Sequence, residues 1–153
     1  MLELQNTLGP WLGKTTKMLA CLVSETFQNN NIDITREQWI FLMKLHQKDG
    51  IPQNELAFIT ERDKTSLTRL VKTMERKELI KRKISETDKR SKLVCLTDEG
   101  RKIFKKSKPI MQQMIKNLQS GLTEEEVRNT INILKRFQEN IMNQSTNCGI
   151  TIK

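Results

Sequence analysis

The chain has 153 residues and a hydrophobic share of 36%, which is enough for one ordinary domain with a core and too little for two independent ones. Its longest strongly apolar run, Trp39 to Met43, is far shorter than the roughly 20 residues that span a bilayer, so we expect a soluble, cytoplasmic protein with no membrane partner. The formal net charge is +9. The chain has three widely spaced cysteines and one histidine, which exclude a disulfide framework or a zinc cluster, so no metal or cofactor is expected.

Two helices are predicted in the first third of the chain. From Trp11 to Phe27 the apolar residues follow a helical period, and Gly9-Pro10 either starts this helix or kinks it, because proline suits a first turn but disrupts an interior. A capping-box pattern, Thr35-Arg-Glu-Gln38, precedes the second helix. This helix is expected to run to about Lys48, before Asp49-Gly50 ends it.

A helix-turn-helix is predicted next. Ile51 is expected to be a single short strand residue, after which Pro52 opens a short helix to Ile59, and Asp63 caps the following helix. The apolar residues of that helix recur at i, i+3, i+4 and i+7: Leu67, Leu70, Val71 and Met74. The opposite face carries a hydroxyl group and cations: Thr65, Arg69, Lys72 and Arg76. Such a face suits the major groove of DNA, where base edges accept hydrogen bonds and phosphates flank them.

A basic hairpin is predicted after this helix. Leu79 to Ile84 and Lys92 to Leu96 are strand-like runs on either side of a polar segment, residues 85–91, which marks an exposed tip. The 32 residues from Glu61 to Lys92 hold 12 Lys/Arg and 6 Asp/Glu, and so carry a net +6 of the total +9. This concentration of positive charge is typical of a phosphate-binding surface.

Two long helices are predicted to complete the chain. Thr97 is expected to cap the first of them, which is bent at Pro109 and closed by Gly121. Thr123-Glu-Glu-Glu126 is a second capping box, and the last helix then runs through Ile141. No repeat or composition break separates domains, so residues 1–153 are expected to form a single one.

The order of these elements and several short motifs resemble the MarR family of bacterial transcription regulators. The motifs are Asn54-Glu-Leu-Ala57, Ser66-Leu-Thr-Arg-Leu-Val71, Met74-Glu-Arg-Lys-Glu-Leu-Ile80, Asp88-Lys-Arg90 and Leu96-Thr-Asp-Glu-Gly100. The resemblance covers nearly the whole chain, although Thr60-Glu-Arg62 stands where many relatives carry a glycine in the turn. It implies a mainly α fold with a small β-hairpin wing, that is, a winged helix-turn-helix. A helical dimerisation region from both termini (residues 1–34 and 98–147) would hold a DNA-binding lobe (residues 35–97).

The resemblance also implies a homodimer that reads a pseudo-palindromic operator in double-stranded DNA, with half-sites about 10 bp apart. Thr65, Ser66 and Arg69 would lie in the major groove, while Arg90 would enter the minor groove and Asp88 would brace the wing. The complete expected DNA-binding set is Lys64, Thr65, Ser66, Thr68, Arg69, Lys72, Arg76, Asp88, Lys89, Arg90 and Lys92.

Relatives in this family enclose a small-molecule cleft among their helices, which implies a small aromatic or amphipathic effector. The corresponding candidates, whose spacing fits a plain core equally well, are Trp11, Trp39, Met43, His46 and Phe104. Peroxide-sensing relatives place a reactive cysteine nearer the start of the first helix than Cys21 stands here. With Ala20 and Leu22 on either side of it, Cys21 is expected to be a small buried hydrophobe.

The sequence thus predicts a homodimeric DNA-binding transcription regulator, a repressor more often than an activator, whose affinity responds to a small effector. The alternative is a winged-helix adaptor that docks another protein and whose basic face is incidental. An enzyme is not expected, because the sequence has no Gly-rich phosphate loop or nucleophile elbow and His46 lacks an evident partner.

Overall fold

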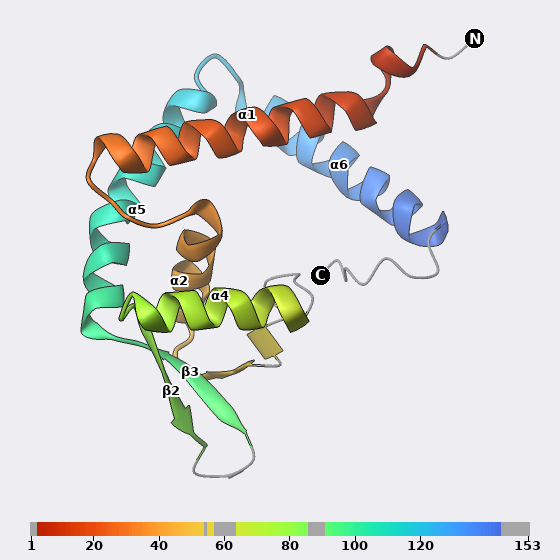
Figure 1. Cartoon of the computed structure of the whole chain (residues 1–153). Coiled ribbons are helices and arrows are strands. Elements are labelled where there is room, and N and C mark those ends of the chain that lie inside the picture. Colours follow the sequence, from red (N-terminus) through yellow and green to blue (C-terminus); the bar gives the residue numbers. More distant parts are fainter. Residues whose placement is uncertain (1–2, 54, 57–63, 86–90, 145–153) are drawn as a thin grey trace.

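The structure is a computed structural model that describes residues 3–53, 55–56, 64–85 and 91–144 (Figure 1). A 3-10 turn, η1 (Leu4–Asn6), precedes the helices. The helices are α1 (Leu8–Asn29), α2 (Arg36–Gln47), α4 (Lys64–Arg76), α5 (Asp98–Leu118) and α6 (Glu124–Gln144). The strands are β1 (Ile51–Pro52), β2 (Ile80–Ile84) and β3 (Lys92–Leu96). The predicted fold class, mainly helical with a small β-hairpin wing, is confirmed.

The two N-terminal helices begin where their local sequence allows it. Because α1 begins at Leu8, Pro10 lies in its first turn, where the missing N–H costs nothing, and this settles the two alternatives for Gly9-Pro10. The predicted capping box of α2 is confirmed: Gln38 N donates to Thr35 Oγ1 (3.2 Å) and Thr35 N donates to Gln38 Oε1 (3.1 Å). Gly50, at φ +69°, follows the end of α2.

The wing is a three-stranded antiparallel sheet in the order β1-β3-β2. Ile51 pairs with Val94, and Ile80 pairs with Leu96, so that the buried side chains of the three strands face the helices. Pro52 belongs to β1 instead of opening a helix, because an edge strand tolerates a residue without an N–H. Of the short helix expected up to Ile59, only residues 53, 55 and 56 are described and helical, and the expected cap Asp63 lies outside the described residues.

The core lies between α2, α4, α5 and the sheet. Its fully buried side chains come mainly from these elements; among them are Phe41, Leu42, Leu45, Ile51, Leu67, Val71, Met74 and Val94. Burying each side chain of this size stabilises the fold by about 1.5–3 kcal/mol relative to leaving it in water. Helices α2 and α4 supply three of these side chains each, so both are fixed in place by the core.

The C-terminal helices start at the predicted caps. Thr97 Oγ1 accepts a hydrogen bond from Gly100 N (3.0 Å) at the start of α5, and Gly121, at φ +83°, follows its end. Thr123 Oγ1 accepts from Glu126 N (3.2 Å), and Glu126 Oε2 accepts from Thr123 N (2.7 Å). Pro109 lies inside α5. Figure 1 shows α6 standing apart from the lobe that holds α4 and the wing, and none of its described residues is buried.

Candidate nucleic-acid interface

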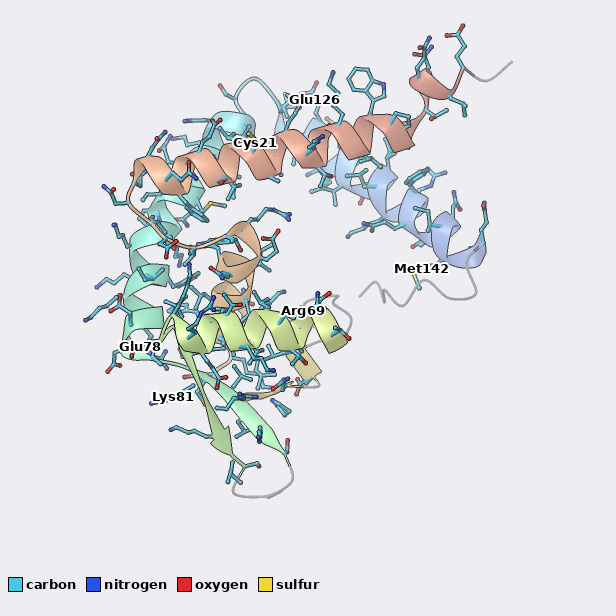
Figure 2. All side chains as sticks on the ribbon, viewed as in Figure 1. Cys21, Arg69, Glu78, Lys81, Glu126 and Met142 are labelled. Atoms are coloured by element: carbon cyan, nitrogen blue, oxygen red, sulfur yellow. The ribbon has the colours of Figure 1, made fainter. Side chains whose placement is uncertain are left out.

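Helix α4 separates an apolar face from a polar, cationic face. Leu67, Val71 and Met74 are buried against the core, whereas Arg69 and Lys72 are exposed. These two sets alternate at helical spacing, so one side of the helix is fixed by packing and the other is free to meet a partner. Figure 2 shows Arg69 on the part of α4 that lies away from the wing.

Most of the DNA-binding residues expected on α4 lie on or beside its exposed face. Thr65, Arg69, Lys72 and Arg76 are at least partly accessible, as are Ser66 and Thr68. Lys64 is the first residue of the helix. On β3, Lys92 is exposed. The three expected wing-tip residues, Asp88, Lys89 and Arg90, lie outside the described residues.

The wing carries three cations along β2 and one at the start of β3. On β2, Lys81, Arg82 and Lys83 are all exposed, and β2 pairs with β3 along its whole length. Ser85 N donates to Ser91 O (3.0 Å), which closes the hairpin just before its tip. The wing therefore presents a basic ridge next to α4, and lysine and arginine side chains of this kind can donate hydrogen bonds to DNA phosphates.

An arginine–glutamate pair that the sequence reasoning missed joins the wing to α4. Arg82 Nε donates to Glu75 Oε1 (2.8 Å), and Arg82 Nη2 donates to Glu75 Oε2 (2.6 Å). Two parallel hydrogen bonds fix orientation as well as distance, so the pair holds β2 at a set angle to the helix. The sequence offered no periodic signal for it, because the segment between the two residues crosses a turn in which Glu78 has φ +57°.

Four of the five residues expected to line an effector cleft come together. Trp39 and Phe104 have ring centroids 6.0 Å apart, and those of His46 and Phe104 are 4.5 Å apart. Trp39 Nε1 donates to Ser107 Oγ (3.0 Å), and Met43 packs against the core beside them. Trp11 is 59% exposed near the start of α1, where Lys14 Nζ lies 5.6 Å from its ring centre.

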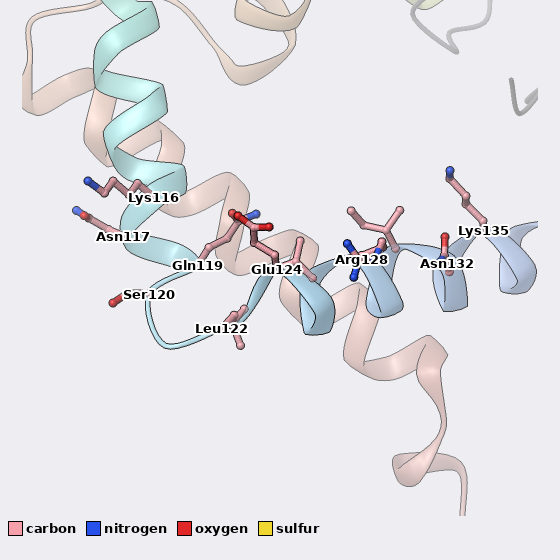
Figure 3. Close-up of a pocket in the computed structure, with 11 residues that line it drawn as sticks. Lys116, Asn117, Gln119, Ser120, Leu122, Glu124, Arg128, Asn132 and Lys135 are labelled. Carbon is pink, nitrogen blue, oxygen red and sulfur yellow. The ribbon is translucent and has the colours of Figure 1, made fainter.

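Two cavities open near the dimerisation helices expected from the sequence. One of about 490 Å³ lies between α1 and α5, lined by Leu22, Thr26, Asn30, Ile110, Gln113, Met114, Asn117 and Leu118. The other, of about 670 Å³, lies between the end of α5 and the start of α6, and Leu122, Val127 and Ile131 supply its apolar lining (Figure 3). None of the five expected effector residues lines either cavity.

The prediction that Cys21 is buried is wrong. Its side chain is exposed on α1, with Sγ 3.7 Å from Glu25 Oε1 (Figure 2). The buried side of α1 is set by Val23 and Phe27, and Cys21 stands about 200° around the helix from Val23. Apolar neighbours in sequence therefore misled the prediction, since adjacent helical residues do not share a face.

The described residues also bear on metal binding and on membrane insertion. They contain no group of three or more His, Cys, Asp or Glu side chains placed to hold a metal ion. None of their helices combines the length and apolarity needed to cross a membrane.

Comparison with known proteins agrees with this geometry. The model of the MarR family matches residues 34–92, which hold α2, β1, α4 and β2 and end at the first residue of β3. The HTH-type transcriptional regulator YdgJ of Bacillus subtilis (strain 168) is 32% identical over 110 residues, covering 72% of this chain and 67% of YdgJ. YybA, a regulator of the same type and organism, is 28% identical over 111 residues, covering 72% of this chain and 74% of YybA.

Solved structures show the same architecture. MepR of S. aureus, in a complex with DNA, superposes with a TM-score of 0.79 at 28% identity, covering 88% of this chain and 98% of MepR. The match extends beyond the winged lobe, since it includes most of the helical part as well. By fold and by sequence, the chain belongs to the MarR family of DNA-binding transcription regulators.

Proposed function

We propose that this protein is a homodimeric repressor that binds a pseudo-palindromic operator through α4 and the wing. The observation that carries the proposal is the division of α4 into a buried apolar face and an exposed face with Thr65, Arg69 and Lys72. Arg69 can make two hydrogen bonds to a guanine edge, and Lys72 and Arg76 are placed to bind phosphates. The MepR complex with DNA supports this use of the fold.

The dimer is supported by apolar surface that one chain leaves uncovered. Large apolar residues stay exposed on α1 and α6 and on the loop before α6, namely Leu8, Trp11, Met18, Leu122, Ile131, Ile133, Ile141 and Met142. So many large apolar side chains left exposed are unusual on a monomer, and a second copy would cover most of them. The helical region of residues 1–34 and 98–147 would then hold two lobes, residues 35–97, about one DNA turn apart.

An effector would bind in the 490 Å³ cavity between α1 and α5. Its volume suits a small molecule, and its lining is mainly apolar with a few polar groups such as Thr26 and Gln113. A ligand that separates α1 from α5 would shift the two lobes and change their fit to the operator. Replacing Gln113 by Trp would fill the cavity and remove the response of DNA affinity to such a ligand.

The decisive experiment is selection of bound genomic fragments at physiological salt, followed by affinity measurements on the selected operator. Arg69→Ala should weaken binding by about 1–3 kcal/mol and relax the choice of base at one position of each half-site. Lys17→Ala, which removes an exposed cation of α1, should change affinity little. Because the operator is chromosomal, the protein would act in the cytoplasm.

The competing function is a protein-interaction adaptor whose basic face is incidental. An adaptor would bind DNA weakly and without sequence preference, and Arg69→Ala would leave this weak binding unchanged. That result, or failure to enrich any palindromic sequence, would refute the repressor proposal.

A further inference from the structure

Helix α5 carries a second concentration of positive charge, separate from the one on α4 and the wing. From Gly100 to Thr123 the chain holds six cationic residues and no Asp or Glu. The six are Arg101, Lys102, Lys105, Lys106, Lys108 and Lys116. This segment therefore has the same net charge, +6, as the longer segment from Glu61 to Lys92, and the remainder of the chain is net negative.

Three of these cations share one exposed stripe. The core face of α5 is formed by Gly100, Phe104, Ser107, Met111 and Met114. Arg101, Lys105 and Lys108 follow one another at i, i+4 and i+7, and all three are exposed. Residues at that spacing stand above one another on a helix, so the stripe runs along α5 outside its core face.

Within the part of the chain that the structure describes, Lys105 and Lys108 have neither a hydrogen-bond nor an ion-pair partner. Their neighbours are engaged, since Arg101 pairs with Asp49 and Lys106 Nζ donates to Asn31 O (3.0 Å). Lys102 Nζ lies 3.8 Å from Glu99 Oε2. The stripe thus offers two unpaired ammonium groups on residues about 4.5 Å apart along the helix axis.

The stripe begins at the base of the wing. Helix α5 starts two residues after β3 ends, and Figure 1 shows it rising from the foot of the hairpin on the side away from α6. Lys105 and Lys108 lie about 10 and 15 Å along the axis from the start of the helix. The exposed apolar residues of α5, Ile115 and Leu118, are in its other half. A second copy would therefore cover that half and leave the lysines accessible.

We propose that Lys105 and Lys108 bind the phosphate backbone of duplex DNA beyond the segment contacted by α4 and the wing. Flanking DNA of any sequence would then add affinity. The proposal rests on the operator-binding function above and extends its footprint. A protein partner fits this stripe less well, because it contains no aromatic or large apolar anchor between its cations, whereas lysines without partners are what a sequence-independent phosphate contact requires.

The test compares two duplexes carrying the same selected operator. One ends at the segment protected by the winged lobes, and the other adds about one helical turn, roughly 10 bp, of arbitrary sequence on each side. Wild-type protein should bind the longer duplex more tightly and with a steeper salt dependence. Lys105→Gln/Lys108→Gln should abolish most of this gain and leave affinity for the short duplex within about twofold. On the longer duplex, the slope of log affinity against log salt should become shallower by about 0.9 for each phosphate that the variant no longer binds.

The control is Lys14→Gln/Lys17→Gln, which removes the same charge from α1 and should keep the gain from flanking DNA. Equal weakening on both duplexes by the α5 variant would overturn the inference, because it would indicate a general loss of charge or of folding. A wild-type protein indifferent to duplex length would overturn it as well, while leaving the operator-binding function intact. If wild-type protein bound neither duplex with sequence preference, the operator-binding function itself would fail.

Discussion

The side chain of Asp49 accepts a hydrogen bond at Oδ1 from the backbone N–H of Leu96, 47 residues later in the chain, at 2.9 Å. The same oxygen accepts from Gly50 N (3.0 Å), and Oδ2 pairs with Arg101. One carboxylate after α2 therefore holds the last residue of β3 and the first turn of α5 together. Because the wing and α5 meet at this point, Asp49 sets how the hairpin leaves the body of the domain.

Removing this carboxylate should loosen the junction. Asp49→Ala leaves two backbone N–H groups without their acceptor, and we expect it to lower the free energy of unfolding by about 1–2 kcal/mol. Asp49→Asn keeps an oxygen acceptor and should cost less, since the ion pair with Arg101 is partly exposed and contributes at most about 1 kcal/mol. Urea unfolding measures both. Asp33→Ala is the control, because Asp33 also pairs with a cation but is 96% exposed. Equal losses at the two positions would contradict this account.

Two glycine-to-alanine changes should have opposite effects. A Cβ on Gly100 would lie 2.0 Å from the carbonyl oxygen of Leu79, so α5 would have to move away from the residue before β2. We expect Gly100→Ala to destabilise the protein by about 2 kcal/mol or more. A Cβ on Gly13, inside α1, meets nothing within 4 Å, and Gly13→Ala should stabilise by about 0.5–1 kcal/mol through the lower entropy of the unfolded chain. Thermal and urea unfolding would measure the stability of both variants. If Gly13→Ala lost stability as Gly100→Ala does, the expected difference between the two sites would be refuted.

The local parts of this fold could be predicted because short sequence patterns determine them. The capping residues Thr35, Thr97 and Thr123 hydrogen-bond three residues ahead, so each helix start is encoded within four residues. The buried stripe of α4 follows from the 3.6-residue period in the same way. These elements also orient Arg69 and Lys72, which is why the exposed face of the candidate interface could be predicted.

Contacts between distant segments could not be predicted from such patterns. The Asp49–Leu96 and Glu75–Arg82 contacts depend on how a hairpin packs against helices, and neither partner carries a periodic signal. Cys21 was misplaced for a related reason, since its exposure depends on which side of α1 meets the core. The stripe on α5 is not evident from the charge of the whole chain, because it emerges only along one face of one helix.

Glu126 should make the start of α6 sensitive to acid. Hydrogen bonds from the backbone and the side chain of Thr123 hold the pKa of its carboxyl below the 4.5 of an ordinary glutamate. The folded carboxyl thus has the lower pKa, so its stabilising contribution is complete above about pH 4.5 and is lost as the pH falls through the folded pKa. Glu126→Gln should remove this part of the acid dependence. Circular dichroism during thermal melting, from about pH 7 to about pH 3.5, would measure it.

The control for that titration is Glu139→Gln, which makes the same charge change near the other end of α6. It should retain the acid dependence of the wild type, since Glu139 is not part of the cap. If Glu126→Gln and Glu139→Gln gave the same profile, the capping hydrogen bonds would not be its source.

The dimer proposed from the uncovered helices can be tested with two isoleucines of α6. Ile131 is 47% exposed and continues the stripe formed by Val127 and Leu134, whereas Ile133 is 51% exposed and stands about 100° or more around the helix from these three residues. If a second copy covers the stripe, Ile131→Glu places a charge inside the interface and should convert the dimer to monomer at micromolar concentration. Ile133→Glu adds the same charge at similar exposure and should leave the dimer largely intact. Light scattering coupled to size-exclusion chromatography would measure the molecular masses. A wild-type mass equal to one chain would refute the dimer. Equal dissociation of the two variants would show that the stripe of Val127, Ile131 and Leu134 is not the interface.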